Sequence, residues 1–354
     1  MRTVLALAVA LLFALVGSYL VWTRPPATLD ANKVSVYVAT QTDVSKIQWS
    51  DDTSTVVIER RNDSLGDYLW VTSTVKTEVI PVPVIEPAPT EEESSEEGGE
   101  REEETPAPVI EPEPTYETTV RSFLGGKKVR DLWEKFTPFQ AIRELPVSAA
   151  SVDLGMDTPH GTIEVTRKSG VLSLVAGKET FGGKQRFLSV DARVFLINNS
   201  DISAFTKPEK LPETRVQPLN RTNAMKVHVT HGGKERTLVR QNPADLRNSF
   251  WADPNTSDKK DAAAETWIFK LLDVKAAAYV ADDEAKTLND TLVSALKVTI
   301  EGEEDSWDVD ILSDGSDSAQ KYYGKSNYSR GLVELNAKAA DVVADLNGFL
   351  NPAE

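Results

Sequence analysis

The chain has 354 residues, of which 40% are hydrophobic, so it is long enough to bury one large core or two modest ones. Its formal net charge is −16, but residues 74–118 alone hold 14 Glu against Lys76 and Arg101, which leaves about −4 for the rest. This local acidity argues against a nucleic-acid-binding face. The absence of cysteine excludes disulfides and a lipoprotein attachment site.

An apolar run opens the chain at Val4–Trp22, "VLALAVALLFALVGSYLVW", and Arg24-Pro25 follow it. Nineteen uncharged residues at about 1.5 Å each nearly span the hydrocarbon core of a bilayer. A cleavable signal peptide is the alternative, with Val16–Ser18 as its small-residue site, but the apolar run continues past that point. The sequence therefore predicts a transmembrane anchor within residues 1–25, crossing at 4–22. We expect a single-pass protein of the bacterial inner membrane with its bulk in the periplasm.

Short alternating strands begin after the anchor and recur about 180 residues later. Apolar residues alternate from Val34 to Val38, and further short strands are predicted around Ile47, Val57 and Tyr68. The matched positions are Lys46–Trp49 with Lys226–Val229, Ile58 and Arg60 with Leu238 and Arg240, and Trp70 with Phe250 beside Trp251.

A second set of matches has an offset of 135 residues. The helical stretch "LWEKFTPFQA", from Leu132 to Ala141, falls on "WIFKLLDVKA", from Trp267 to Ala276. Further matches are Ile163 and Val165 with Val298 and Ile300, Leu172–Ala176 with Trp307–Ile311, and Arg186-Phe187 with Lys321-Tyr322. A last strand and helix, "RVFLINNSDISAF" and "GLVELNAKAADVV", match at about 138. Because the order is preserved throughout, the sequence predicts two tandem copies of one unit, at residues 31–210 and 214–350.

The change of offset locates an insertion in the first copy. If the early elements match at 180 and the later ones at 135, the first copy holds about 45 extra residues between Trp70 and Leu132. The Pro/Glu-rich stretch at 75–118 has that length and place, and "VIEPAPT" and "VIEPEPT" flank its acidic centre. Such a composition cannot bury enough apolar surface to offset its ordering entropy. We therefore expect a disordered acidic insertion, and not a linker between domains.

Several motifs together resemble a known family. They are the anchor followed by Arg24-Pro25, the Leu132-Trp133 helix, "DLGMDTPHGTIEV" at Asp153–Val165 and "RFLSVDARVFLI" at Arg186–Ile197. In these the chain resembles the bacterial domain-of-unknown-function family numbered 4340, best over 122–208. The resemblance implies an anchored extracytoplasmic protein associated with gliding-type ABC exporter components, in an accessory or scaffold role. It brings no catalytic residues, and the second copy lacks the "DTP" turn.

Candidate metal sites in the sequence are weak. His228 and His231 form an H-x-x-H, but at strand spacing they point to opposite faces and no Glu or Cys flanks them. His160 follows Pro159 in a turn and is a polar loop residue. An acidic run could suggest calcium, but it lacks the EF-hand pattern and alternates with apolar residues as the wet face of a strand. Its members are Asp305, Asp308, Asp310, Asp314 and Asp317. No metal and no cofactor is predicted.

The remaining motifs also favour structural roles. The pieces Gly125–Lys128 and Gly177–Gln185 lack the spacing of a phosphate-binding loop, and the second is predicted as a hairpin loop. No serine lies in a G-x-S-x-G elbow. Tryptophans could form a sugar platform, but most fall where the other copy is apolar, which favours core packing. They are Trp49, Trp70, Trp133, Trp251, Trp267 and Trp307.

The sequence as a whole predicts an α+β fold, with two tandem antiparallel strand-rich units that carry helices behind one anchor. No catalytic residue is assigned, and we expect a non-enzymatic scaffold or accessory subunit of an envelope transport complex. Its partners would be the membrane, through residues 4–22, and other envelope or transporter proteins, and not nucleic acid. The alternative is a periplasmic enzyme or binding module for envelope polysaccharide, which a deep pocket with converging carboxylates would favour.

The predicted anchor has a direct biochemical test. If Val4–Trp22 stays attached, the protein should remain in the membrane pellet after alkaline carbonate extraction, because a spanning helix is not released by charge disruption. N-terminal sequencing should then find the mature chain starting at or near Met1. A mature start near Tyr19, with the protein in the soluble fraction, would contradict the anchor.

Overall fold

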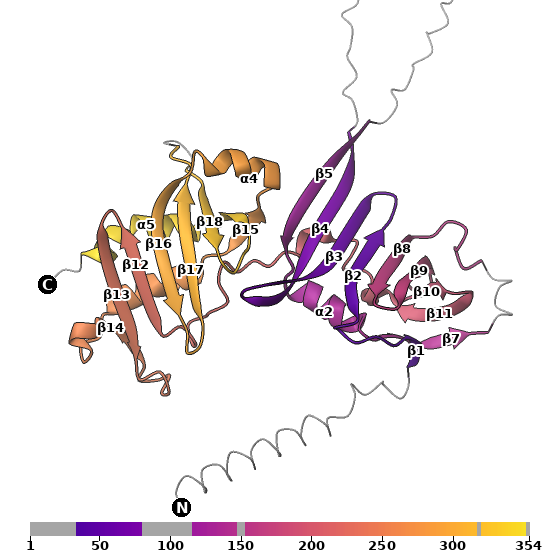
Figure 1. Ribbon diagram of the computed structural model, residues 1–354, viewed down its shortest axis with the longest axis horizontal. Helices are drawn as coiled ribbons and strands as arrows, with labels where there is room; N and C mark the ends of the chain where they lie inside the picture. Colours follow the sequence, from indigo (N-terminus) through magenta and orange to yellow (C-terminus); the bar gives the residue numbers. More distant parts are fainter. Residues whose placement is uncertain (1–32, 80–114, 147–152, 317–319, 352–354) are drawn as a thin grey trace, which may run out of the picture. The chain divides into compact units, whose positions relative to one another are not determined.

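The computed structural model describes residues 33–79, 115–146, 153–316 and 320–351 (Figure 1). The predicted anchor at 4–22 and the acidic centre of the predicted insertion lie outside these ranges. Among the helices of the described ranges, none combines the length and the apolar composition that crossing a membrane would need.

The described chain is a strand-rich α+β protein with two large antiparallel sheets, as the sequence predicts. Its strands are β1 (Val34–Tyr37), β2 (Val44–Ser50), β3 (Ser54–Asp63), β4 (Gly66–Val79), β5 (Thr115–Leu124), β6 (Phe139–Ala141), β7 (Arg143–Leu145), β8 (Gly161–Arg167), β9 (Gly170–Glu179), β10 (Gln185–Val190), β11 (Arg193–Asn198), β12 (Lys226–His231), β13 (Lys234–Gln241), β14 (Phe250–Ala252), β15 (Ala276–Tyr279), β16 (Val293–Glu301), β17 (Ser306–Ser313), β18 (Tyr322–Ser326) and β19 (Leu332–Leu335). Its α-helices are α2 (Lys127–Lys135), α3 (Ala262–Leu272), α4 (Asp282–Asn289), α5 (Lys338–Ala344) and α6 (Leu346–Leu350). Short 3₁₀ turns are η2 (Asn199–Asp201), η3 (Pro208–Lys210) and η4 (Pro254–Thr256).

The same strand order occurs in both large sheets. In the nine-stranded sheet it is β5-β4-β3-β2-β8-β9-β10-β11-β7, and in the eight-stranded sheet it is β14-β13-β12-β16-β17-β18-β19-β15. A separate two-stranded sheet pairs β1 with β6. When each strand is matched by its place, β5 is the extra member of the first sheet. It follows directly on the segment that the sequence marks as inserted.

The registers repeat as well as the order. Ile47 pairs with Ile58 in the first sheet, and Val227 pairs with Leu238 in the second, at the predicted offset of 180. Ile163 opposite Leu174 is repeated by Val298 opposite Val309, at the predicted offset of 135. All of these side chains are buried. Because a slip of one residue would turn every side chain to the other face, equal registers place equivalent residues in equivalent cores.

Two details of the predicted matches are wrong. Arg60 pairs with Leu69, whereas Arg240 pairs with Trp251, because the loop between β13 and β14 is two residues longer than its counterpart. Trp251 is therefore the counterpart of Leu69, and Trp70 is not the counterpart of Phe250. Trp251 is buried, while Trp70 is half-buried.

The second wrong detail is the closing helix that the sequence predicts for the first copy. Helix α5 forms in the second sheet's unit, but the matching segment of the first forms the three-residue turn η2. Asn, Ser and Asp are weak helix formers that bond to nearby backbone, whereas α5 holds three alanines. Asp201 of this turn accepts a hydrogen bond from Asn198 N and pairs with Lys135, Nζ to Oδ1 2.5 Å.

The chain divides into two compact units, each built from two separate stretches. The first comprises the described residues of 1–45 and 131–203. Its core includes Phe136 and Phe139, whose rings stack with centroids 4.4 Å apart. Strand β1 is tied to this core by Tyr37, whose hydroxyl donates to the Phe136 carbonyl at 2.6 Å.

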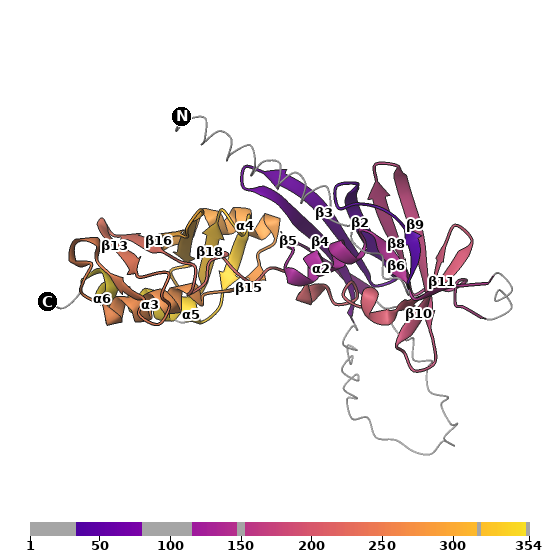
Figure 2. The ribbon, with the colours of Figure 1, turned by 90° about the horizontal axis from the view of Figure 1, so that it is seen from below.

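The second unit comprises the described residues of 46–130 and 204–354, and it contains the eight-stranded sheet. Helices α3, α5 and α6 lie on one face of that sheet (Figure 2). Trp267 of α3 stacks on Phe349 of α6, with ring centroids 4.0 Å apart, and its indole N–H donates to the Val342 carbonyl at 2.9 Å. These contacts bury the apolar face of the sheet and leave its alternate residues, such as Asp308, exposed.

Strands β4 and β5 correct the boundaries of the predicted insertion. The sequence places the insertion at 75–118, but β4 continues to Val79 and β5 begins at Thr115. The two strands stay paired to their ends, where Val79 lies opposite Thr115. The side chains of residues 76–79 on β4 and 115–121 on β5 are exposed. A backbone ladder therefore supports these residues without a buried apolar face, which the composition alone did not predict.

This pairing gives a sharp test of the insertion. Replacing residues 80–114 with Asn-Gly should close β4 and β5 as a two-residue hairpin. Each halving of a flexible loop lowers its closure cost by about 0.6 kcal/mol, so the melting temperature should stay the same or rise. A matched control replaces 76–118, which also removes the exposed ladder. A cooperative loss of stability in the first variant, measured by thermal unfolding, would show that the fold needs residues 80–114.

Candidate functional site

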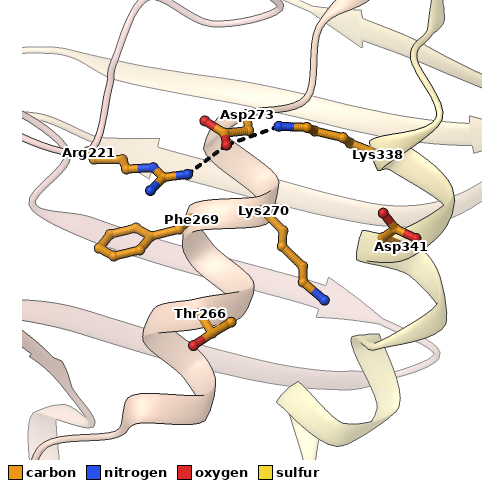
Figure 3. Close-up of a pocket in the computed structure, with 7 residues that line it drawn as sticks. All are labelled: Arg221, Thr266, Phe269, Lys270, Asp273, Lys338 and Asp341. Atoms are coloured by element: carbon orange, nitrogen blue, oxygen red, sulfur yellow. Dashed lines mark hydrogen bonds and ion pairs between the residues drawn. The ribbon is translucent and has the colours of Figure 1, made fainter.

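A polar hollow of about 280 Å³ lies beside helices α3 and α5 (Figure 3). Its lining comes from the loop before β12, from α3 and its C-cap, and from α5. The residues are Arg221, Thr266, Phe269, Lys270, Asp273, Lys338 and Asp341. All of them belong to the second unit.

Helix α3 decides which side chains reach the hollow. Asp261 caps its N-terminus by accepting a hydrogen bond from Ala264 N at 2.9 Å, and the same carboxylate pairs with Arg236 at 2.6 Å. The helix buries Trp267, Ile268 and Leu271 against its neighbours. With 3.6 residues per turn, the positions between these, including Lys270, face outward and line the hollow.

Most of the charged side chains that line the hollow are already in ion pairs within the protein. Asp273 Oδ2 accepts from Arg221 Nη2 at 2.6 Å and from Lys338 Nζ at 3.1 Å, as the dashed lines in Figure 3 mark. Lys270 pairs with Asp345 at 2.6 Å, and the Arg221 guanidinium lies 4.8 Å from the centre of the Phe269 ring. Four of the five charged side chains that line the hollow are thus paired. An anion that bound here would compete with the internal carboxylates for these donors.

The acidity of Asp273 reflects this pairing. Partial burial works to raise the pKa of its carboxyl, but hydrogen bonds from Lys338 and Arg221 outweigh that effect and lower the pKa below its usual value. The group is therefore ionised at neutral pH. It cannot act there as a general acid, and a carboxylate of lowered pKa is a weak base.

A second cluster surrounds the buried carboxylate of Glu213, whose side chain is only 6% exposed. Oε1 accepts from the backbone N–H groups of Thr214 and Arg215, at 3.1 and 3.2 Å. Oε2 accepts from Arg215 Nη2 at 3.1 Å, from the Tyr328 hydroxyl at 3.2 Å and from Arg130 at 3.4 Å. The carboxylate thus links helix α2 to the backbone just after Glu213 and to the turn between β18 and β19.

The backbone around Glu213 is held by the end of β5. Glu213 N donates to the Leu124 carbonyl and Gly126 N donates to the Leu211 carbonyl, both at 2.8 Å. A Cβ on Gly126 would lie 2.7 Å from the Pro212 carbonyl oxygen, so only glycine fits there. Gly125-Gly126 therefore serve a close backbone approach at the start of α2, and not a phosphate.

Burial works to raise the pKa of Glu213, but hydrogen bonds from the side chain and backbone of Arg215 outweigh it and lower the pKa overall. Burial raises the pKa of Tyr328, and the neighbouring Glu213 charge adds to this. The Tyr328 phenol therefore stays protonated at neutral pH, and the cluster is an ionised carboxylate held by donors. It is suited to holding backbone segments together.

The candidate metal ligands considered from the sequence line neither the hollow nor the Glu213 cluster. His228 and His231 are on β12, and His228 Nδ1 lies 2.9 Å from the Thr237 hydroxyl oxygen. Asp308 and Asp310 accept from Thr299 and Ser294, at 2.7 and 2.6 Å. Across the described ranges, no three His, Cys, Asp or Glu residues gather closely enough to hold a metal ion.

Two further predictions have clear outcomes. Strand β9 ends at Glu179 and β10 begins at Gln185, which confirms the hairpin predicted over Gly177–Gln185. Core packing is confirmed for Trp49, Trp133, Trp251 and Trp267, whereas Trp70 and Trp307 are half-buried. Sequence reasoning did not single out Glu213, because Arg130 and Tyr328 lie 83 and 115 residues away from it.

Comparison with known proteins gives no relative. No family model, no curated protein and no solved structure matches this chain. The resemblance to the family numbered 4340 therefore stays a prediction from its motifs.

The Glu213 cluster predicts a specific effect on stability. Glu213→Gln keeps the shape but removes the charge that two guanidinium groups face, and should lower the free energy of unfolding at neutral pH by about 2 kcal/mol. Because folding lowers the pKa of Glu213, its contribution is full above the ordinary glutamate pKa and is lost as the pH falls through the folded-state pKa.

The control is Glu209→Gln, since Glu209 is exposed on η3. Urea unfolding of both variants at neutral and acidic pH should show a penalty for Glu213→Gln that shrinks on acidification, and little change for Glu209→Gln. Equal penalties at the two positions, or a penalty independent of pH, would contradict the assigned role.

Proposed function

We propose that this protein is a membrane-anchored, non-catalytic scaffold or accessory subunit of an envelope transport complex. The best support comes from the hollow beside α3 and α5, where ion pairs within the protein hold the charged side chains. These are Arg221, Lys270, Asp273 and Lys338. A catalytic site needs groups whose pKa values lie near the working pH and whose partners are free to exchange protons. Here the pKa of Asp273 is shifted away from neutrality.

We also infer that the two large sheets belong to tandem copies of one unit, at 31–210 and 214–350. Their common strand order and their common registers support this inference. A duplicated sheet offers two similar surfaces on one chain, which suits a protein that holds partners side by side. Shared architecture by itself carries no chemistry, so the duplicated fold supports a role in assembly and not a reaction.

The anchor at 4–22 and the family resemblance support the location of this scaffold. On this proposal the protein crosses the bacterial inner membrane once and places its folded part in the periplasm. Its partners would be envelope or transporter proteins, including ABC exporter components. The alternative, an enzyme or binding module for envelope polysaccharide, would need exposed stacking faces. The half-buried rings of Tyr68 and Trp70 instead face the guanidinium groups of Arg330 and Arg61, at 4.1 and 5.5 Å from the ring centres.

The proposal predicts protein partners that depend on the anchor. The full chain, cross-linked in intact cells and purified in detergent, should retain the same few integral membrane proteins in near-stoichiometric amounts by mass spectrometry. The matched control replaces residues 1–25 with a cleavable signal peptide, which keeps export but removes anchoring, and should lose them. Release of soluble sugar from isolated envelope polysaccharide by the purified chain would instead establish the enzymatic alternative.

A further inference from the structure

Phe181 lies fully exposed at the tip of the loop between β9 and β10. Its relative exposure is 109%, the largest among the exposed large hydrophobic residues of the described chain. A phenylalanine in this position removes none of its ring from water. Because the fold gains nothing from this ring, the ring is available to an external apolar partner.

The loop that carries Phe181 is held in one shape. Thr180 N donates to the Gln185 carbonyl at 2.8 Å, and Gly183 N donates to the Thr180 carbonyl at 2.9 Å. The side chain of Asn199 also donates to the Gly183 carbonyl, at 3.2 Å. Gly182 and Gly183 have φ angles of +89° and +68°, which favour glycine. The turn therefore presents the ring outward at low ordering cost on binding.

The loop between β17 and β18 comprises residues 314–321, three residues more than the loop at 180–184, and its sequence holds no aromatic residue. Asp314 there accepts hydrogen bonds from Ser316 N and Lys321 N, each at 3.2 Å, and Ser316 is exposed. A loop at this place in the fold does not require an aromatic residue. The apolar tip is thus a property of the first sheet alone.

Beside Phe181, Lys184 is the lysine that an anionic surface can bind without breaking the ion pairs described for this loop. Lys178 and Lys184 flank the loop, and Glu179, the acidic residue between them, is neutralised by Arg186 at 2.7 Å. Lys178 pairs with the exposed Asp153. At a lipid headgroup region this ring would meet the acyl chains while the lysine ammonium would meet phosphate.

The length of the chain before β1 keeps this unit near the bilayer. Eleven residues separate Trp22 from Val34, and fully extended they reach at most about 40 Å. Val34 pairs with Ala141, and the next residue, Ile142, donates to the Leu196 carbonyl at 2.8 Å. Leu196 lies near the C-terminal end of β11. Asn199 follows that strand and donates a hydrogen bond to the Gly183 carbonyl in the Phe181 loop. The chain thus enters the unit on the β6 side of β11, and β11 pairs with β10, the strand that follows the Phe181 loop.

We propose that Phe181 inserts into the interfacial region of the same bilayer that holds the anchor, so that the first unit touches the membrane at two points. This inference rests on the anchored location in the proposed function. A single ring would bind a vesicle weakly, but the tether raises its effective concentration at the surface. The second contact would restrict how the unit turns on its tether.

The absence of cysteine makes the test site-specific. The full chain carrying Phe181→Cys is labelled with an environment-sensitive fluorophore and reconstituted in nanodiscs that contain anionic lipid. We expect the fluorophore's emission to be blue-shifted relative to the free label in detergent-free buffer. We also expect its emission to be lost when the lipids carry a spin-label quencher. The same label at Ser316→Cys, the matched loop, should show neither change. Unaltered thermal unfolding would show that both variants fold.

A third label, at Ala10→Cys within the apolar run, separates the two proposals. If the Ala10 label is quenched by lipid and the Phe181 label is not, the anchor stands and the second contact is wrong. If neither is quenched, the anchor proposal fails and this inference fails with it. A blue shift at Phe181 without lipid quenching would identify a protein contact in place of a bilayer, and equal quenching at Phe181 and Ser316 would also overturn the proposal.

Discussion

The buried carboxylate of Glu213 ties several segments of the second unit together. It brings together the end of β5, the start of α2 and the turn after β18, because each contributes a donor or a backbone contact. An unpaired carboxylate in this environment would be costly, so the surrounding donors must stay in place while the fold persists. Gly126 permits the close backbone approach that puts Glu213 there.

The equivalent turns of the two sheets show how one backbone carries different chemistry. Ala192 and Arg330 occupy matching places and share a left-handed conformation, with φ angles of +64° and +55°. Ala192 has no polar side chain, but Arg330 donates two hydrogen bonds to Asp63, at 2.6 and 3.1 Å, and covers the Tyr68 ring. The two turns differ in length, but each has a left-handed residue just before the last strand of the pair, and only Arg330 makes a side-chain contact there.

Internal pairing of charge also organises the proposed function. In the hollow beside α3, the groups that could have bound an anion or moved a proton are held by one another. What the molecule offers outward is an exposed β4–β5 ladder and the ring of Phe181. Surfaces of this kind suit contacts with other large structures, since their chemistry is burial and backbone pairing and not bond cleavage.

Period-two alternation and preserved order determined the strand-rich fold, the hairpin at Gly177–Gln185 and the repeat offsets at Ile47 and Ile163. Each of these depends on residues close in sequence or on a repeat. The sequence could not place β4 beyond Lys76, since the ladder there is stabilised by backbone bonds that leave no apolar pattern. Nor could it identify Glu213 or the hollow, whose partners are distant along the chain. Only the tertiary structure decided which charges meet, because pairing of charges depends on distance in space.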